Sequence, residues 1–246
     1  MIELDELIRY CDRLLDPGAF QDYCPNGLQV QGRARVRRLV AGVTASQALI
    51  EAAAEARADA LLVHHGFFWK GESPVVTGRR RRRLARLLEA DISLIAYHLP
   101  LDAHPRLGNN ARLGELLGFE PEGTFGAPGM PELAWRGRLP GPMAPPALAE
   151  RIGQVLGRRP QHLAPRDPCA PGAAQGYIEA AAALGLDAFI SGEVSEQTWH
   201  VTQEAGIHYF AAGHHATERY GAEALGRHLA EQFGLDFEFV EIYNPV

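Results

Sequence analysis

The chain has 246 residues, which is long enough for one large domain or two small ones. Hydrophobic residues make up 46% of it and charged residues 22%, as in an ordinary globular protein that folds in water. The net charge of -6 argues against a nucleic-acid-binding surface over the whole molecule, but it leaves room for a local basic patch.

Three cysteines, Cys11, Cys24 and Cys169, are odd in number and form no C-x2-C pair, which favours a reducing compartment and argues against zinc-finger chemistry. The first residues are acidic and lack the apolar segment of a signal peptide. No apolar stretch reaches the length that spans a membrane. We therefore expect a cytoplasmic protein.

The first part of the chain alternates segments of helical and strand character. Apolar residues at helical spacing from Leu4 to Leu15 predict an amphipathic helix, which Pro17-Gly18 ends. The next expected elements are strands over 36–43, 60–63 and 92–97 and helices over 45–58, 80–90 and 109–117. This β-α-β order indicates a parallel sheet with helices on its faces, and thus an α/β fold.

Residues 119–146 are rich in Gly and Pro and have no long period, so we expect a linker with one short strand near 133–138. The segment after it repeats the order of the first, with helices expected over 147–156, 174–184, 196–204 and 218–233 and strands over 188–191, 207–211 and 236–242. The predicted organisation is two interlinked α/β halves, 1–118 and 147–246, joined by the linker 119–146.

A repeat in the sequence relates the two halves. Residues 50–62 align without a gap with residues 178–190, and Gln47 then falls on Gln175. A second matched piece follows each copy, so that His98 with Asp102 falls on His214 with Glu218. Each half therefore places a His-x3-carboxylate pattern after an apolar strand.

Ligand-type residues fall at or just after the ends of the expected strands: His64, His65, His98, Asp102, Glu193, His214 and Glu218. In an open α/β sheet, ligands bind beyond the carboxyl ends of the parallel strands, so these side chains converge if the halves face one another. Imidazole and carboxylate groups suit Zn, Mn, Fe or Mg. The alternative is that the repeat is only structural and the histidines cap strands.

Consecutive residues of a strand point to opposite faces, so His64 and His65 are better placed to bind two neighbouring ions than one. A carboxylate can bridge two such ions, a role that is open to Asp102 or Glu218. Two ions about 3.5–4 Å apart activate a water and stabilise the developing negative charge, which is typical of hydrolases.

Five segments together resemble the motif set of the YbgI family, also called Nif-three-like proteins or GTP cyclohydrolase I type 2 homologs. They are residues 25–30 (PNGLQV), 64–71 (HHGFFWKG), 98–102 (HLPLD), 192–197 (GEVSEQ) and 213–219 (GHHATER). The resemblance covers essentially the whole chain. It implies two interlinked, pseudo-repeated α/β domains with a metal site between them, and a toroidal homohexamer with a dinuclear metal centre facing its interior.

Carried over position by position, the resemblance implies that two divalent ions per subunit, of Fe, Zn or Mn, are bound by His64, His65, Asp102, His214 and Glu218. One departure is visible. The family usually has a Gly-Gly-Gly-Gln turn before the helix of the second half, whereas this chain has Gly172-Ala173-Ala174-Gln175. Glycine allows positive φ, so the turn is expected to be reshaped, with no effect on a ligand.

Other residues have two interpretations each. The run Arg79–Arg83 is either a solvated helix start or a phosphate-binding patch for nucleotide or DNA. Phe68 and Trp69 either stack on a base or pack against a loop or a subunit. His98 and Glu193 are candidates for proton transfer or for support of the ligands.

Two classes of function fit this pattern. The first is a metal-dependent hydrolase of a small molecule such as a nucleotide, with the purine ring opening that the family name suggests and with His98 and Glu193 moving protons. The second is a non-catalytic metal-binding scaffold or regulator that docks DNA or another protein. The enzyme is favoured, because a scaffold needs the ligands but not His98 and Glu193 as well.

Overall fold

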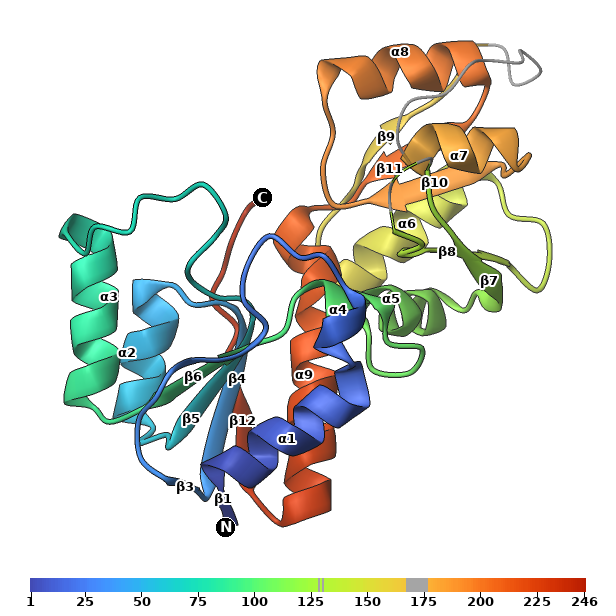
Figure 1. Ribbon diagram of the computed structural model, residues 1–246. Helices are drawn as coiled ribbons and strands as arrows, with labels where there is room; N and C mark the ends of the chain where they lie inside the picture. Colours follow the sequence, from blue (N-terminus) through green and yellow to red (C-terminus); the bar gives the residue numbers. More distant parts are fainter. Residues whose placement is uncertain (128, 130, 167–176) are drawn as a thin grey trace. The chain divides into compact units, whose positions relative to one another are not determined.

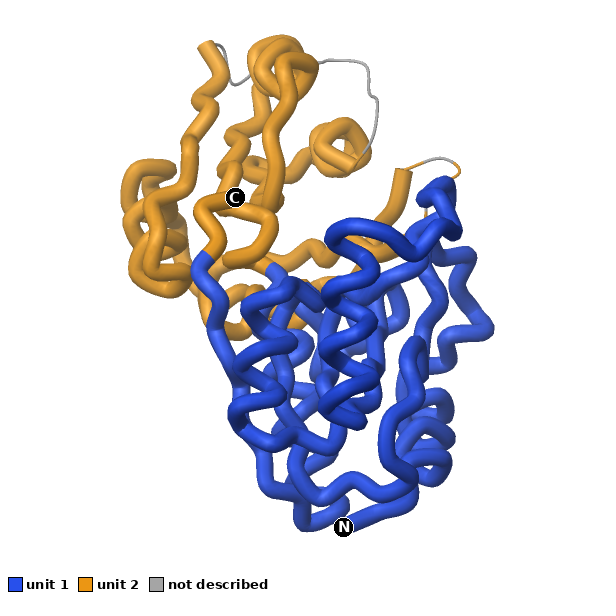
Figure 2. The backbone as a smooth tube through the Cα atoms, turned by 90° about the vertical axis from the view of Figure 1, so that its left-hand side faces the viewer, with its two compact units in different colours: residues 1–109, 218–243 blue, residues 110–217, 244–246 orange. Residues whose placement is uncertain are grey.

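The chain divides into two compact units, coloured separately in Figure 2, in a computed structural model that describes residues 1–127, 129, 131–166 and 177–246. The first unit holds residues 1–109 and 218–243, and the second holds residues 110–217 and 244–246. The bounds differ from those of the expected halves. Residues 218–243 belong to the first unit, and residues 119–146, expected as a linker, belong to the second.

A five-stranded sheet forms the centre of the first unit, with the strand order β12-β4-β5-β6-β2 (Figure 1). Its strands are β12 (Asp236–Phe239), β4 (Arg38–Thr44), β5 (Ala60–His65), β6 (Ser93–Ala96) and β2 (Gly27–Val30). The first four are parallel and β2 runs antiparallel to β6. A short antiparallel pair, β1 (Ile2–Glu3) and β3 (Arg35–Val36), completes the strands described in this unit.

Helices cover both faces of this sheet, as the predicted β-α-β order requires (Figure 1). One face carries α1 (Leu4–Leu15) and α9 (His214–Phe233), and the other carries α2 (Gln47–Glu55) and α3 (Gly78–Glu89). Side chains alternate along a strand, so Ala60 and Leu62 of β5 join the core with α1 and α9, whereas Leu61 and Val63 join the core with α2 and α3. The predicted α/β fold is therefore confirmed.

Two short helices connect these elements, the 3-10 helix η1 (Pro17–Ala19) and α4 (Leu99–Ala103). Helix α5 (Asn109–Leu117) begins at the last residue of the stretch 1–109 and otherwise belongs to the second unit. Helix α4 follows directly after β6, so it starts at the carboxyl edge of the parallel strands, where binding sites of α/β sheets are found.

The second unit contains a three-stranded sheet with the order β10-β11-β9. Its described elements are the strands β9 (Gln161–Leu163), β10 (Ala188–Ser191) and β11 (His208–Ala211), the helices α6 (Pro145–Leu156), α7 (Tyr177–Ala183) and α8 (Glu196–Ala205), and the pair β7 (Glu120–Phe125) and β8 (Ala134–Arg138). The expected strand at 133–138 is confirmed as β8, which pairs antiparallel with β7. The Gly172-Ala173-Ala174-Gln175 turn and Cys169 lie outside the described residues.

The two sheets share a pattern of strand pairing that reflects the repeat in the sequence. In the first unit β5 is parallel to β6, which is antiparallel to β2. In the second unit β10 is parallel to β11, which is antiparallel to β9. The aligned pieces therefore occupy corresponding strands in the two units.

The strand register nevertheless corrects the second matched piece by one residue. Asp59 accepts a backbone hydrogen bond from Ser93, and its repeat partner Asp187 accepts one from His208. Ser93 therefore corresponds to His208, and counting forward from this pair places His98 opposite Gly213. The predicted equivalence of His98 and His214 is wrong, because similarity along one strand does not determine its pairing register.

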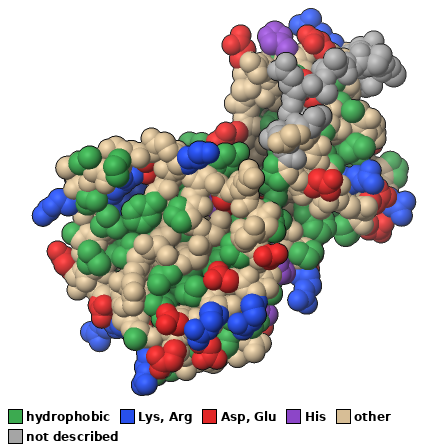
Figure 3. Space-filling model, viewed as in Figure 1, with side chains coloured by type: hydrophobic (Ala, Val, Ile, Leu, Met, Phe, Trp, Pro, Cys, Tyr) green, Lys and Arg blue, Asp and Glu red, His purple; other side chains and the backbone are tan. Residues whose placement is uncertain are grey.

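The surface of the described residues carries charges of both signs. Acidic and basic side chains are mixed over the face shown in Figure 3. Among the described residues, no helix is both long enough and apolar enough to cross a membrane.

Leu62 gives a test of the core that supports the candidate site. Its side chain is fully buried in β5, two residues before His64. Replacing Leu62 by Ala should lower the free energy of unfolding by about 2–5 kcal/mol, because apolar contacts are lost and a cavity remains. Leu88→Ala, at a side chain that is 61% exposed, is the control and should change it by less than about 0.5 kcal/mol. Urea unfolding of the metal-free protein measures both, and equal effects would contradict this description of the core.

Candidate metal centre

Four ligand-type side chains of the first unit gather beyond the carboxyl ends of β5 and β6. His64 and His65 end β5, Asp102 lies on α4, and Glu218 lies on α9. His64 Nε2 is 3.5 Å from Asp102 Oδ1 and 3.8 Å from Glu218 Oε2, and His65 Nε2 is 3.1 Å from the same Glu218 oxygen. One carboxylate oxygen of Glu218 thus faces both imidazoles, whose ring centroids are 4.6 Å apart.

These side chains have little contact with water, so it is unfavourable for more than one of the carboxyl groups to be ionised. His64 is fully buried and Asp102 is buried, while the side chains of His65 and Glu218 are 16% and 22% exposed. Burial and then the charge of Glu218 raise the pKa of Asp102 to about 7, against hydrogen bonding from Asn109. Two neighbouring carboxylates with little access to water are unfavourable, and a bound cation would relieve their repulsion.

The imidazoles of this cluster are oriented through their second ring nitrogen. His64 Nδ1 is 3.0 Å from the backbone oxygen of Tyr97, and His65 Nδ1 is 3.2 Å from Thr44 Oγ1. Both contacts leave Nε2 directed toward the carboxylates. Histidines that bind metal ions usually hold Nδ1–H in this way, which fixes the ring and the tautomer.

Asn109 holds the carboxylate of Asp102 and was not among the predicted site residues. Its Nδ2 donates to Asp102 Oδ1 over 2.8 Å, and its Oδ1 accepts from the backbone nitrogen of Gly221 over 2.7 Å. A Cβ at position 221 would lie 2.6 Å from that oxygen, so Gly221 permits the close approach of α9. Asn109 therefore ties α4 to the segment of α9 that carries Glu218.

His98 lies beside the two imidazoles, at the start of α4. Its ring centroid is 5.0 Å from that of His64 and 5.7 Å from that of His65. His98 Nδ1 is 2.7 Å from Asp22 Oδ1, and the His98 backbone nitrogen donates to Asn26 Oδ1 over 2.7 Å. Burial lowers the pKa of His98, but the hydrogen bond and the charge of Asp22 outweigh burial and raise it.

Asp22 and Asn26 were also missed by the sequence analysis, although Asn26 belongs to the PNGLQV segment. They reach His98 because β2 is antiparallel to β6, with Gly27 opposite Ala96. Residues just before β2 therefore lie next to residues just after β6. Such proximity between segments 76 positions apart has no signal in a single sequence.

The remaining predicted site residues, His214 and Glu193, contact each other within the second unit. His214 Nδ1 is 2.8 Å from Glu193 Oε1. His214 also precedes Glu218 by one turn in α9, which places the two side chains on the same face of that helix. Of the two roles considered for Glu193, the contact favours support of His214.

The arginine run and the aromatic pair near the histidines are both located in the first unit. Arg79–Arg83 form the first turns of α3, and Arg80 pairs with Glu72. The pKa of Arg83 is lowered by burial and then by the charges of neighbouring arginines. Trp69 packs edge-on against His98, with ring centroids 5.1 Å apart and an interplanar angle of 87°, whereas Phe68 is 40% exposed with a φ of 65°.

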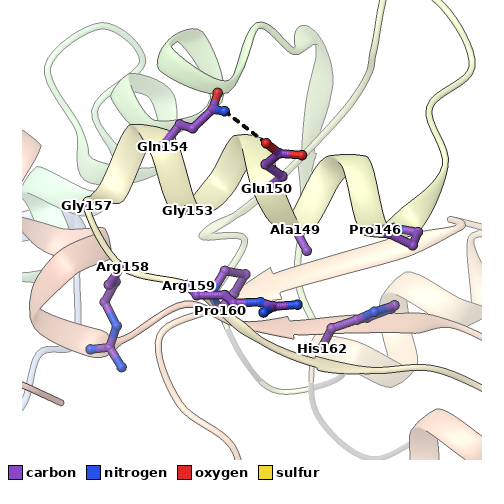
Figure 4. A pocket seen from close by; sticks show the side chains of 10 residues that line it. All are labelled: Pro146, Ala149, Glu150, Gly153, Gln154, Gly157, Arg158, Arg159, Pro160 and His162. Atoms are coloured by element: carbon purple, nitrogen blue, oxygen red, sulfur yellow. Dashed lines mark hydrogen bonds between the residues drawn. The ribbon is translucent and has the colours of Figure 1, made fainter.

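An open groove of about 930 Å³ lies in the second unit, beside α6 (Figure 4). Its lining includes Glu150, Arg158, Arg159 and His162. Among the described residues, none of the groups of three or more side chains that could hold a metal ion includes a residue of this groove. The groove is thus a separate feature from the histidine and carboxylate cluster.

The whole chain is similar in sequence to known proteins. The chain is 56% identical over 252 residues to "GTP cyclohydrolase 1 type 2 homolog" of Allochromatium vinosum, a match that covers 100% of this chain and 98% of that protein. It is 53% identical over 250 residues to the protein of the same name from Pseudomonas aeruginosa, with 99% of each chain covered.

A solved structure of similar sequence also has a similar fold. The protein ybgI, described as of unknown function, superposes with a TM-score of 0.90 at 45% identity, and the match covers 100% of both chains. The sequence model of the family described as Duf34/NIF3 (NGG1p interacting factor 3) matches residues 2–245. Because this match spans nearly the entire chain, the protein belongs to the Duf34/NIF3 family.

Proposed function

We propose that the protein is a hydrolase with a dinuclear metal centre, and that it opens the ring of a purine nucleotide in the manner of a type 2 GTP cyclohydrolase. The observation that carries the metal part is the single Glu218 oxygen that faces both His64 and His65, beside the buried carboxyl group of Asp102. The name shared by the relatives supports the substrate class.

The donor set fits two divalent ions such as Fe, Zn or Mn. His64, Asp102 and Glu218 each offer a ligand atom, and these atoms lie within 4.8 Å of one another, so the three could hold one ion. His65 would hold the second ion with Glu218 as a shared ligand, and His214 would join it through its position one turn before Glu218. Bound ions would supply Lewis acidity and would lower the pKa of a water molecule.

The protein's own residues would divide the remaining work. His98 lies beside the imidazoles but has its own carboxylate partner, so it is suited to accept and return a proton at Nε2. Glu193 would orient His214 through Nδ1. Asn109 would keep the Asp102 carboxylate directed at the site.

We also propose, from the family resemblance, that the protein forms a toroidal homohexamer in the cytoplasm. Light scattering at micromolar concentration is the direct test of the assembly. A stable monomer under these conditions would contradict it.

Removal of single ligands should reduce metal content. Elemental analysis of Zn²⁺-loaded protein should find two ions per chain in the wild type, and one or fewer in His64→Ala. Glu218→Ala should bind neither ion tightly, because both positions share this carboxylate. His200→Ala, at an exposed histidine on α8, is the control and should keep the wild-type content. Unchanged metal in both cluster variants would refute the centre.

Metal affinity should fall as the pH is lowered through 7. The raised pKa of Asp102, about 7, means that the metal-free site holds a proton below this pH that an incoming ion must displace. From this group alone, apparent Zn²⁺ affinity should therefore drop by about fivefold between pH 7 and pH 6, and by about tenfold for the next pH unit. Competition with a chelator measures it, and Asp102→Asn should bind more weakly with a flatter pH dependence. An affinity independent of pH in the wild type would argue against this assignment.

The His98→Ala variant tests whether the protein is an enzyme or a non-catalytic metal-binding scaffold. In the enzyme, His98→Ala should retain its metal and lose roughly 10²–10⁴-fold in turnover of GTP, the usual size of a general acid-base contribution. Loss of substrate measured by chromatography on metal-loaded protein tests this. Absence of any turnover in wild-type protein across a panel of nucleotides and phosphoesters would favour the scaffold.

A further inference from the structure

We propose that Asp22 is a positioning residue that fixes the tautomer of His98, so that His98 presents an unprotonated Nε2 as a proton acceptor outside the metal-ligand set. The functional meaning of this inference rests on the proposed metal centre. Its geometry belongs to the first unit alone and can be tested without metal.

The Asp22 carboxylate is surrounded by hydrogen-bond donors. Oδ1 accepts from the Tyr23 backbone nitrogen over 2.6 Å and lies 2.7 Å from His98 Nδ1. Oδ2 accepts from Asn26 Nδ2 over 2.9 Å and from the Leu99 backbone nitrogen over 3.0 Å. Backbone and amide N–H groups can only donate, so this pattern is made for an ionised carboxylate.

The ionised state of Asp22 determines which nitrogen of His98 carries the proton. Burial raises the pKa of Asp22, but the hydrogen bonds from His98 and Asn26 outweigh burial and lower it to about 2. A carboxylate without a proton can only accept, so His98 Nδ1 must be the donor in this pair. A neutral imidazole carries one N–H, which leaves the lone pair on Nε2.

The ring of His98 is also held in place by its surroundings. Its backbone nitrogen is bonded to Asn26 Oδ1. Trp69 packs edge-on against one side, and the Tyr23 ring lies 6.4 Å away, centroid to centroid, at 62°. The imidazole therefore cannot exchange Nδ1 and Nε2 by a ring flip without breaking its bond to a carboxylate whose side chain is only 4% exposed.

His98 differs from the neighbouring imidazoles in the charge of its partner. His64 and His65 hold a carbonyl and a hydroxyl oxygen at Nδ1, both uncharged. A carboxylate at Nδ1 stabilises the imidazolium that forms when Nε2 takes a proton, as in acid-base pairs of hydrolases. The ligand atoms of His64, Asp102 and Glu218 lie within 4.8 Å of one another, so these three residues could hold one ion. His98 lies within the same distance of His64 and His65, but among the described residues no such group joins it to either carboxylate.

A separate metal site made of Asp22, Cys24 and His98 is the main rival, since their ligand atoms lie within 4.8 Å of one another. Burial and then the charge of Asp22 raise the pKa of the Cys24 thiol to about 12, so an ion that bound the thiolate would first have to displace this proton. Both oxygens of Asp22 are already engaged by donors. These three residues are thus better suited to orient an imidazole than to hold an ion.

Nitrogen NMR of the full chain labelled with ¹⁵N-histidine tests the tautomer directly. Correlations between ring protons and ring nitrogens show which nitrogen is protonated, and His98→Gln assigns the His98 signals. At a pH high enough for the His98 imidazole to be neutral, metal-free wild-type protein should show Nδ1–H and an unprotonated Nε2 at His98. Asp22→Asn should move the proton wholly or partly to Nε2, while the matched control Glu193→Gln should leave the His98 signals unchanged. An Nε2–H tautomer in the wild type would overturn the inference, whether or not the variant folds.

Zn²⁺ affinity tests the place of His98 outside the ligand set. Asp22→Asn should change the affinity by no more than about threefold, whereas Glu193→Gln, which removes the partner of a proposed ligand, should weaken it by about 10–100-fold. A loss of that size in Asp22→Asn would make His98 a ligand and overturn the assignment as a free acceptor. Failure of the wild type to bind Zn²⁺ would refute the proposed centre instead, while the metal-free spectra would still decide the role of Asp22.

Discussion

The candidate site depends on two carboxylates, Asp102 and Glu218, that are held close together at a place with little access to water. The two carboxylates repel each other, and contacts of other residues hold them in place. Asn109 bonds both to Asp102 and to the backbone of α9, and Leu225 and Leu229 of α9 are buried in the same core as Leu62. Apolar packing of α9 on the sheet thus offsets the cost of bringing Glu218 to the histidines.

Each histidine of the site has a hydrogen-bond partner at Nδ1, which directs Nε2 away from that partner. The partners differ in kind: a backbone oxygen at His64, a hydroxyl group at His65, and carboxylates at His98 and His214. A neutral partner orients the ring, whereas a charged partner also changes the affinity of the other nitrogen for a proton or an ion. The choice of partner can therefore give different tasks to side chains of identical chemistry.

The sequence predicted the parts of this site that follow from local pattern. The apolar run before His64 predicted β5, and the position of Asp102 after the next strand placed it at the same edge of the sheet. The supporting residues could not be predicted, because Asp22 and Asn26 reach His98 through an antiparallel edge strand and Asn109 reaches α9 across 112 positions. The equivalence of His98 and His214 failed for a related reason, since a repeat in sequence leaves the pairing register undetermined.

The division of the first unit into two stretches of chain has a consequence for biosynthesis. Its sheet ends with β12, which pairs with β4 across roughly two hundred intervening residues, and α9 precedes β12 directly. Domains fold as they emerge from the ribosome, but this one cannot complete its core until the last strand has been made. His64, His65 and Asp102 are therefore synthesised well before Glu218. The order of synthesis itself keeps the other candidate ligands of this unit without Glu218 until α9 has been made.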